Sequence, residues 1–341
     1  MDKSKVINYI ETSFLQELIN NPEVTDISYN GVDIYYVSNI KGRIKSDIVV
    51  EHGIIKDFIR QIANLCEAQF SFTNPNLDLS VGRFRINATH QSIGRVKDEG
   101  VITFDIRLAS SELRINDNSD FFTPQIVSFI RELLNRKYSI VIGGVTSSGK
   151  TEFQKYLLSQ FVNNERILVI DNVLELDSIR NEKSDLTIWK SDNENEKTSA
   201  STLIKNALRN NPDWLILAEA RGEEMVDVLN SAMTGIPLIT TIHALDVESM
   251  PYRMGRMMMK SRQKLDYKES LEDIYYHFHY YFYLKKELVD GKIKRYIAQI
   301  AYVDNQGNMS LLFEKNNNEF VYYEDLIKFI DAPKGQKERT I

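Results

Sequence analysis

The chain has 341 residues, of which 43% are hydrophobic and 26% are charged. This composition is typical of globular proteins and excludes a largely disordered chain, and the length predicts two domains of mixed class. The formal net charge of −6 gives no overall electrostatic reason to bind nucleic acid, so such binding would need a local basic patch.

The cysteine content and the lengths of the apolar runs indicate where in the cell the protein is located. Cys66 is the single cysteine, which excludes an intramolecular disulfide and a cysteine-based zinc cluster and fits a reducing cytoplasm. The polar residues at the start of the chain predict no secretory signal, and no run of about 18 apolar residues occurs. We therefore expect no transmembrane segment and a cytoplasmic location, with membrane association arising through partners.

Residues 1–108 predict a compact N-terminal α+β domain. Apolar residues recur at helical spacing in 6–20 and in 54–70, and strand patterns occupy much of the remainder. The predicted strands are 24–28, 34–37, 42–49, 77–81, 84–89 and 101–108. The polar segment 109–123 is predicted as a linker, because Pro124 then takes a favoured first-turn position of a new helix.

Residues 124–341 alternate between strand and helix patterns, which predicts an α/β domain. Such alternation implies a parallel sheet whose ligand lies at the carboxyl ends of the strands. The predicted helices are 124–136, 150–163, 202–208 and 226–233, and the predicted strands are 140–142, 166–170, 213–218 and 238–242. A small C-terminal region from about residue 264 is predicted to hold a helix over 264–273 and an aromatic strand over 275–283.

A phosphate-binding loop is predicted after the strand at 140–142. The pattern G-x-x-x-x-G-K-[ST] is matched by Gly144, Gly149, Lys150 and Thr151. In this pattern backbone N–H groups surround the phosphates, the lysine reaches the β- and γ-oxygens, and the hydroxyl holds Mg²⁺. The glycines permit close backbone approach, and the helix that follows presents free N–H donors to an anion. The other candidates for nucleotide contact in this stretch are Thr146, Ser147, Ser148 and Glu152.

A catalytic carboxylate is predicted at the end of the apolar strand 213–218. Hydrolysis of a bound triphosphate requires a carboxylate near Mg²⁺ and the attacking water, and Glu219 follows this strand directly. Glu219 either polarises the water or completes the metal shell, and the sequence does not separate these roles. An acid that caps the following turn is the alternative.

Four further segments carry a family resemblance. Residues 166–176 look like an acidic box, and residues 208–222 look like a Walker B segment. Residues 240–244 look like a histidine box, and in the first domain residues 23–31 also match the pattern of the family. Together they resemble the hexameric secretion ATPases that power type IV secretion and conjugation, type II secretion, and type IV or tight-adherence pili. The resemblance covers nearly the whole chain and is closer to the conjugation and tight-adherence branch than to the pilus-retraction branch.

The resemblance implies roles for further side chains. His243 would sense the γ-phosphate and couple it to movement, and Asp171 and Glu175 would be acidic-box carboxylates. The arginines implied to reach the nucleotide or a neighbouring subunit are Arg85, Arg107 and Arg221. A surface salt bridge for each arginine, a solvated acid for Glu175 and a structural histidine stay open as alternatives. Two departures, Asp171-Asn172 for the usual Glu-Asp and Ala218 for the usual glycine, favour reduced or retuned hydrolysis.

By resemblance, the chain is a motor ATPase with an N-terminal α+β domain and a C-terminal RecA-like P-loop domain. The resemblance further implies ATP and Mg²⁺ as ligands, a homo-hexamer, and inner-membrane secretion or pilus-assembly components as partners, with no direct nucleic-acid contact. Two alternatives stay open. One is a nucleotide-gated structural ring with weak hydrolysis, and the other is a nucleic-acid-translocating RecA-like motor, which the acidic composition disfavours.

Overall fold

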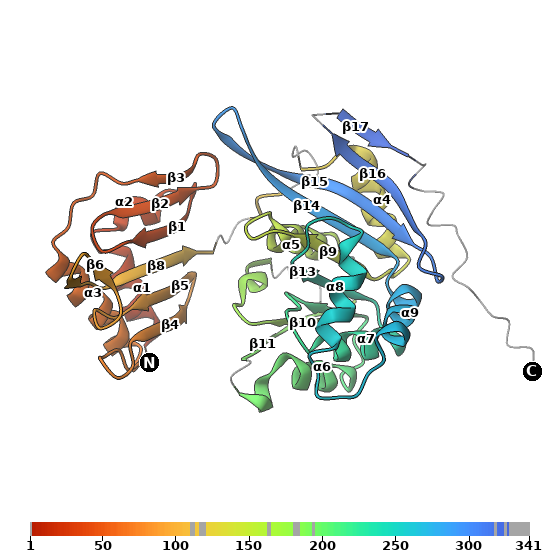
Figure 1. The fold of residues 1–341 in the computed structure, drawn as a ribbon, viewed down its shortest axis with the longest axis horizontal. Helices are drawn as coiled ribbons and strands as arrows, with labels where there is room; N and C mark the ends of the chain where they lie inside the picture. The colour runs from red at the N-terminus through yellow and green to blue at the C-terminus, as the bar shows by residue number, and fades with distance from the viewer. Residues whose placement is uncertain are drawn as a thin grey trace, which may run out of the picture. The chain divides into compact units, whose positions relative to one another are not determined.

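The computed structural model divides into two compact units (Figure 1). The structure describes residues 2–109, 113–115, 121–161, 165–179, 185–192, 195–316, 319–323 and 326. The smaller unit comprises Met1–Ser111 together with Leu288–Lys294, and the larger unit comprises Glu112–Glu287 and Arg295–Ile341. Each unit has a hydrophobic core of its own.

A six-stranded antiparallel sheet forms the smaller unit, in the order β3-β2-β1-β8-β5-β4. Its strands are β1 (Val24–Tyr29), β2 (Ile34–Ser38), β3 (Gly42–Lys45), β4 (Asn76–Val81), β5 (Phe84–Thr89) and β8 (Thr103–Leu108), with a short pair β6 (Arg95–Val96) and β7 (Glu99–Gly100). Its helices are α1 (Lys3–Glu11), α2 (Gln16–Asn20) and α3 (His52–Leu65). Helix α3 buries Phe58 and Ile62, spaced four apart, in one core with the cross-strand pair Ile86 and Ile106.

The predicted helix 6–20 is interrupted in the structure, where it forms α1 and α2. Thr12 Oγ1 donates a hydrogen bond to the Asn8 carbonyl oxygen and Ser13 Oγ donates one to the Ile10 carbonyl oxygen, each at 2.7 Å. The same two carbonyl oxygens also accept the backbone N–H groups of Thr12 at 3.0 Å and of Ser13 at 3.2 Å. The hydroxyls therefore add to the backbone hydrogen bonds at the end of α1.

A nine-stranded mixed sheet forms the larger unit, in the order β11-β10-β12-β13-β9-β14-β15-β16-β17 (Figure 1). The strands from β11 to β14 pair in parallel, and β15, β16 and β17 pair antiparallel. The strands are β9 (Ile140–Gly144), β10 (Arg166–Asp171), β11 (Asp185–Lys190), β12 (Trp214–Leu217), β13 (Leu238–Ile242), β14 (Tyr280–Val289), β15 (Lys292–Val303), β16 (Met309–Asn316) and β17 (Glu319–Tyr322). The helices are α4 (Pro124–Asn135), α5 (Lys150–Gln160), α6 (Ala200–Leu208), α7 (Met225–Met233), α8 (Ser249–Met258) and α9 (Tyr267–His277), with 3-10 turns η1 (Glu175–Ile179) and η2 (Glu196–Thr198).

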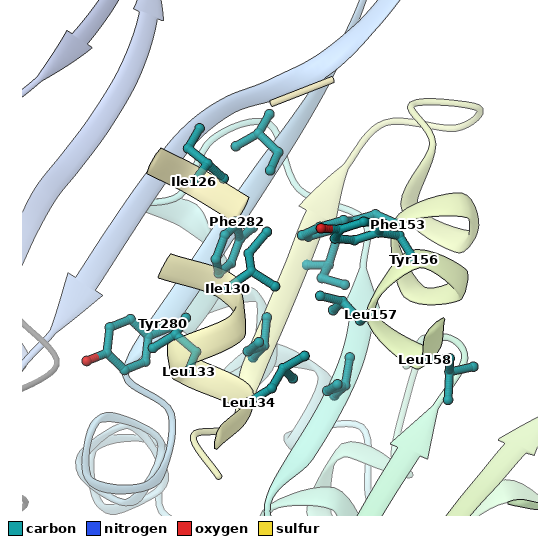
Figure 2. Packing of buried hydrophobic residues seen from close by; sticks show 14 of the residues in the cluster. Ile126, Ile130, Leu133, Leu134, Phe153, Tyr156, Leu157, Leu158, Tyr280 and Phe282 are labelled. Carbon is teal, nitrogen blue, oxygen red and sulfur yellow. The ribbon is translucent and has the colours of Figure 1, made fainter. Parts of the chain in front are cut away.

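The central strands of this sheet are buried on both faces. Along β9, Ile140 and Ile142 point into a core shared with α4 and α5, and Val141 between them points into a core shared with α7 and α8. Figure 2 shows the first of these cores, where side chains of α4 and α5 surround Phe282 of β14. Burial on both faces explains why these strands read as continuous apolar runs. The predicted α/β fold class is confirmed.

The predicted aromatic strand 275–283 is wrong at its start, because α9 continues into this range and β14 begins only at Tyr280. Asp266 caps α9 by accepting two backbone N–H groups of its first turn. Ile274 then packs into the core on the α7 and α8 side. Consecutive aromatic residues fit either a helical or a strand period, so packing sets this boundary.

Helices long and hydrophobic enough for a bilayer do not occur in the ranges that the structure describes.

We expect Phe282→Ala to destabilise the larger unit by about 3–5 kcal/mol, because the ring is fully buried and its removal leaves a cavity beside Phe153. Urea unfolding followed by tryptophan fluorescence measures this loss, since Trp189 and Trp214, the two tryptophans of the chain, lie in the larger unit. The matched control is Phe320→Ala, which removes the same atoms from a residue that is 46% exposed and should cost roughly half as much or less. Equal losses would contradict the packing described here.

Candidate active site

The loop between β9 and α5 has the backbone geometry of an anion cradle. Gly149, immediately before α5, takes a left-handed φ of +100°, which glycine adopts without a Cβ penalty. A Cβ on Gly144 would lie 2.7 Å from the carbonyl oxygen of Leu284 and would also clash with Ser148 Oγ. The first N–H groups of α5 have no acceptor within the helix, so this end of the helix can bind an anion.

The Lys150 side chain lies inside this loop. Its Nζ donates hydrogen bonds to the carbonyl oxygens of Gly144 at 2.9 Å and of Val145 at 3.0 Å. In the same loop, Ser148 Oγ is buried and has no hydrogen-bond partner within the described ranges. A buried hydroxyl without a partner is costly, so this group fits a ligand with oxygen atoms, such as a phosphate. Thr151 is half-buried one residue further along α5.

The tip of the loop and the first turn of α5 hold the other predicted contact residues. Thr146 and Ser147 are exposed at the tip. Glu152 is engaged elsewhere, because its Oε1 lies 3.1 Å from Nζ of the buried Lys155 and its Oε2 accepts the backbone N–H of Arg114 at 3.3 Å. The Glu152 side chain therefore links α5 to the chain segment that precedes α4.

Glu219 lies in a charged cluster just after β12. Its Oε2 accepts hydrogen bonds from Arg221 Nε at 2.8 Å and from Arg221 Nη2 at 2.6 Å. Its Oε1 lies 2.8 Å from His243 Nε2. The Glu219 side chain is 18% exposed, so the carboxylate is held between a guanidinium and an imidazole in a partly desolvated setting, where charge-assisted hydrogen bonds are strong.

Parallel strand pairing brings this cluster to the phosphate loop. Strand β12 pairs with β13, and β13 pairs with β9, so the carboxyl ends of all three strands meet at one edge of the sheet. Glu219 and His243 follow β12 and β13 at that edge. Thr241 Oγ1 donates to the Ala218 carbonyl oxygen at 2.7 Å and fixes the two strand ends relative to each other.

The protonation state of His243 is set by burial and by nearby charges. Burial disfavours the imidazolium and the Lys150 ammonium repels it, so the pKa of His243 lies below its ordinary value of 6.5. The Glu219 carboxylate and a hydrogen bond with the Gly144 backbone act in the opposite direction, and Arg221 adds to the lowering. His243 is therefore neutral at pH 7 and is in contact with both the carboxylate and the phosphate loop.

Asp171 and Glu175 lie at the carboxyl end of β10, the strand next to β12. Asp171 is buried, and its two carboxylate oxygens accept the backbone N–H groups of Val173 at 2.9 Å and of Leu176 at 3.2 Å. These bonds organise the loop that follows β10. Glu175 begins η1 and is half-buried. Asp171 thus has a structural task beside the catalytic one that the sequence predicts.

Arg85 and Arg107 are cross-strand neighbours in the smaller unit. The antiparallel register of β5 and β8 places them directly opposite each other, and Arg107 also lies opposite Asp26 of β1. Arg85 Nε is 4.0 Å from Asp78 Oδ1. Like charges in directly opposed positions of a sheet are unfavourable, and Asp26 and Asp78 on the neighbouring strands offset this repulsion.

Two polar residues of this region are absent from the sequence-based prediction. Gln154, one turn after Lys150, is buried and donates from Nε2 to the Leu217 carbonyl oxygen at the end of β12 at 3.1 Å. Arg295 of β15 donates from Nε to the Ser147 carbonyl oxygen at 2.8 Å. The spacing from Lys150 is a signal for Gln154, whereas 148 positions separate Arg295 from Ser147 and no local pattern joins them.

Comparison with known proteins identifies relatives of the chain. Residues 101–275 match the family model described as type II/IV secretion system protein. An uncharacterized protein of Bacillus anthracis is 30% identical, over 93% of this chain and 76% of its own length. The type IV secretion system protein VirB11 of Brucella suis is 33% identical over 141 residues, which are 40% of this chain and 39% of that protein. In fold, the crystal structure of the ATPase DotB of Legionella pneumophila is similar, with a TM-score of 0.59 at 17% identity, covering 90% of this chain and 82% of that one.

The pKa of His243 should move in opposite directions in two variants. Lys150→Met removes a repelling charge and should raise the pKa, whereas Glu219→Gln removes an attracting charge and should lower it further. NMR titration of the imidazole Cε1–H signals measures both shifts, with His243→Gln to assign the signal. His90 is the internal control, because its lowered pKa arises from burial and from charges within the smaller unit, and it should not move. Shifts of His243 in the same direction in both variants would contradict the geometry of the cluster.

Proposed function

Because this chain belongs to the type II/IV secretion system protein family, within the secretion ATPase superfamily, we propose that it hydrolyses ATP to drive a type IV secretion or conjugation machine or a related pilus-assembly machine. The proposal takes ATP as substrate and Mg²⁺ as cofactor. The chain would act as a homo-hexamer at the inner face of the cell membrane, together with inner-membrane components and without direct contact to nucleic acid. The relationship to VirB11, a type IV secretion system protein, supports this class of machine.

The observation that carries the proposal is the meeting of Lys150, Glu219 and His243 at one edge of the sheet. Hydrolysis of a phosphoanhydride needs a cation at the phosphates and a carboxylate that orients water. The loop with Lys150 supplies the first group, and Glu219 supplies the second. His243 lies beside both groups. Its Nε2 is 2.8 Å from Glu219 Oε1, and its imidazole forms a hydrogen bond with the Gly144 backbone.

Binding of the nucleotide would use the loop as it stands. The Lys150 ammonium would exchange its bonds to two loop carbonyl oxygens for bonds to the β- and γ-phosphate oxygens. Ser148 Oγ would gain the partner that it lacks, and the first N–H groups of α5 would donate to the phosphates. Thr151 and Glu219 are the residues that would hold Mg²⁺, which supplies positive charge against the phosphate oxygens when bound.

Glu219 would orient the attacking water and accept its proton. A carboxylate oxygen has two acceptor sites, and Arg221 uses both sites of Oε2, so Oε1, the oxygen beside His243, is the one that would accept a hydrogen bond from the water. The two neighbours hold the carboxylate in one orientation, which favours reaction because the base is already in place. His243 would pass changes of charge at the loop to Glu219 electrostatically, because both the Lys150 ammonium and the Glu219 carboxylate act on its imidazole.

The arginines of the smaller unit complete the proposal. Arg85 and Arg107 would neutralise charge on the transferred phosphoryl group, in the same subunit or a neighbouring one. The register of β5 and β8 places the two arginines side by side, which supports a joint role. Delivery of these arginines to the nucleotide would make hydrolysis depend on conformation and on assembly.

A second candidate function is a nucleotide-gated structural ring with weak hydrolysis. It is favoured by Asp171, because each of its carboxylate oxygens already accepts one backbone N–H group, which holds the buried side chain to the loop after β10 and leaves fewer acceptor sites for catalysis. In that case ATP would bind and hold the assembly together without rapid turnover.

The test is steady-state ATP hydrolysis measured against protein concentration, together with equilibrium ATP binding. Lys150→Ala and Glu219→Gln should each lower turnover by about 10²- to 10⁴-fold, because each removes a group that acts on the reacting phosphate or water. Turnover per subunit should rise as the chain assembles.

Matched controls come from an exposed ion pair of α9. Lys268→Ala and Glu272→Gln make the same two chemical changes on side chains that are 88% and 65% exposed, and turnover should not change. ATP binding with assembly but negligible turnover of the wild type would favour the structural ring, and absence of ATP binding would reject both functions.

A further inference from the structure

The phosphate loop contains a left-handed residue that is not glycine. Ser147 has a φ of +61°, a region in which the Cβ of an L-residue is crowded by the neighbouring carbonyl oxygen. The residue lies at the exposed tip of the loop, where no core packing can impose this conformation. Such backbone strain persists where surrounding contacts over-determine it.

A side chain from the far end of the sequence contacts this residue. Arg295 Nε donates to the Ser147 carbonyl oxygen at 2.8 Å. The aliphatic part of the same side chain lies against the next glycine, since Arg295 Cδ is 3.7 Å from where a Cβ on Gly149 would be. A guanidinium stays charged at every physiological pH, so its bond to a carbonyl oxygen is charge-assisted.

The peptide unit between Ser147 and Ser148 is therefore fixed on both sides. A trans peptide directs its C=O and its N–H in opposite directions, so the bond to Arg295 also sets the direction of the Ser148 N–H. That N–H donates to the Val145 carbonyl oxygen at 3.2 Å. The same oxygen accepts from Lys150 Nζ, so the turn of the loop and the lysine share one acceptor.

We infer that Arg295 is a positioning residue that holds Ser147 in its left-handed conformation and so keeps the phosphate loop shaped for nucleotide. The effect on nucleotide affinity rests on the proposed function, whereas the contact between Arg295 and Ser147 does not. A loop that is already shaped for its ligand loses less conformational freedom on binding, so affinity rises. Arg295 acts on the loop from β15, two strands away from β9 in the sheet order.

The first part of the test uses hydrogen exchange of the full chain without nucleotide. In Arg295→Gln, amides of the loop should exchange about tenfold faster, because a charge-assisted hydrogen bond is lost. Lys294→Gln is the matched control, since it removes a positive charge from the adjacent residue of the same strand, and loop exchange should not change. Unchanged exchange in Arg295→Gln overturns the inference, whether or not the chain binds ATP.

The second part measures the Kd for ATP by equilibrium titration. Arg295→Gln should raise the Kd about tenfold, and Arg295→Lys should raise it less because an ammonium can still donate to the carbonyl oxygen. Ser147→Gly in the Arg295→Gln background should recover most of the affinity, because glycine takes a positive φ without strain. Thermal unfolding of each variant checks that the fold is intact.

The two parts separate the possible failures. A raised Kd with unchanged loop exchange, or no recovery by Ser147→Gly, would mean that Arg295 touches the nucleotide itself and would overturn the positioning role. A wild-type chain that binds no ATP would reject the proposed function. Even then, faster hydrogen exchange of the loop in Arg295→Gln, with no change in Lys294→Gln, would support the contact between Arg295 and Ser147.

Discussion

The parallel register of β10, β12, β13 and β9 is the constraint on which the candidate site depends. These strands are buried on both faces, so a shift of one residue would move each side chain from one core to the other. The register therefore fixes where each strand ends, and the residues that follow the strands meet at one edge. The phosphate loop after β9, His243 after β13 and Glu219 after β12 share this edge for that reason.

Positive and negative groups act on the same side chains at this edge of the sheet. Glu219 is the negative group between Arg221 and His243, and the Lys150 ammonium acts on the same imidazole from the loop side. Arrival of a polyanion at Lys150 would weaken the repulsion that lowers the pKa of His243. The imidazole can thus respond to the charge state of the loop, and through it so can the carboxylate proposed to activate water.

The phosphate loop combines permissive and restrained backbone positions. Gly144 and Gly149 allow close approach and a left-handed turn, as expected for such a loop. Ser147 takes a left-handed conformation without being glycine, and a charged hydrogen bond from Arg295 holds it. The shape of the loop therefore depends on β15 as well as on its own sequence, which gives the C-terminal part of the sheet a direct influence on the candidate site.

The sequence by itself determined the fold class and the position of the glycine-rich loop between β9 and α5. Alternating apolar runs and amphipathic segments indicate a parallel α/β sheet, and the spacing from Gly144 to Thr151 indicates a loop between strand and helix, because both signals are local. Local signals failed where the residue pattern fits a helical and a strand period equally well. The aromatic stretch 275–283 is such a case, because its first residues belong to the end of α9.

Only the tertiary structure decided which distant residues meet. Strand register places Arg85 opposite Arg107 and brings His243 to Glu219. The contact of Arg295 with Ser147 spans 148 positions of sequence. A side chain's neighbours across such a separation are set by how strands are ordered in the sheet, and the local residue pattern carries no information about that order.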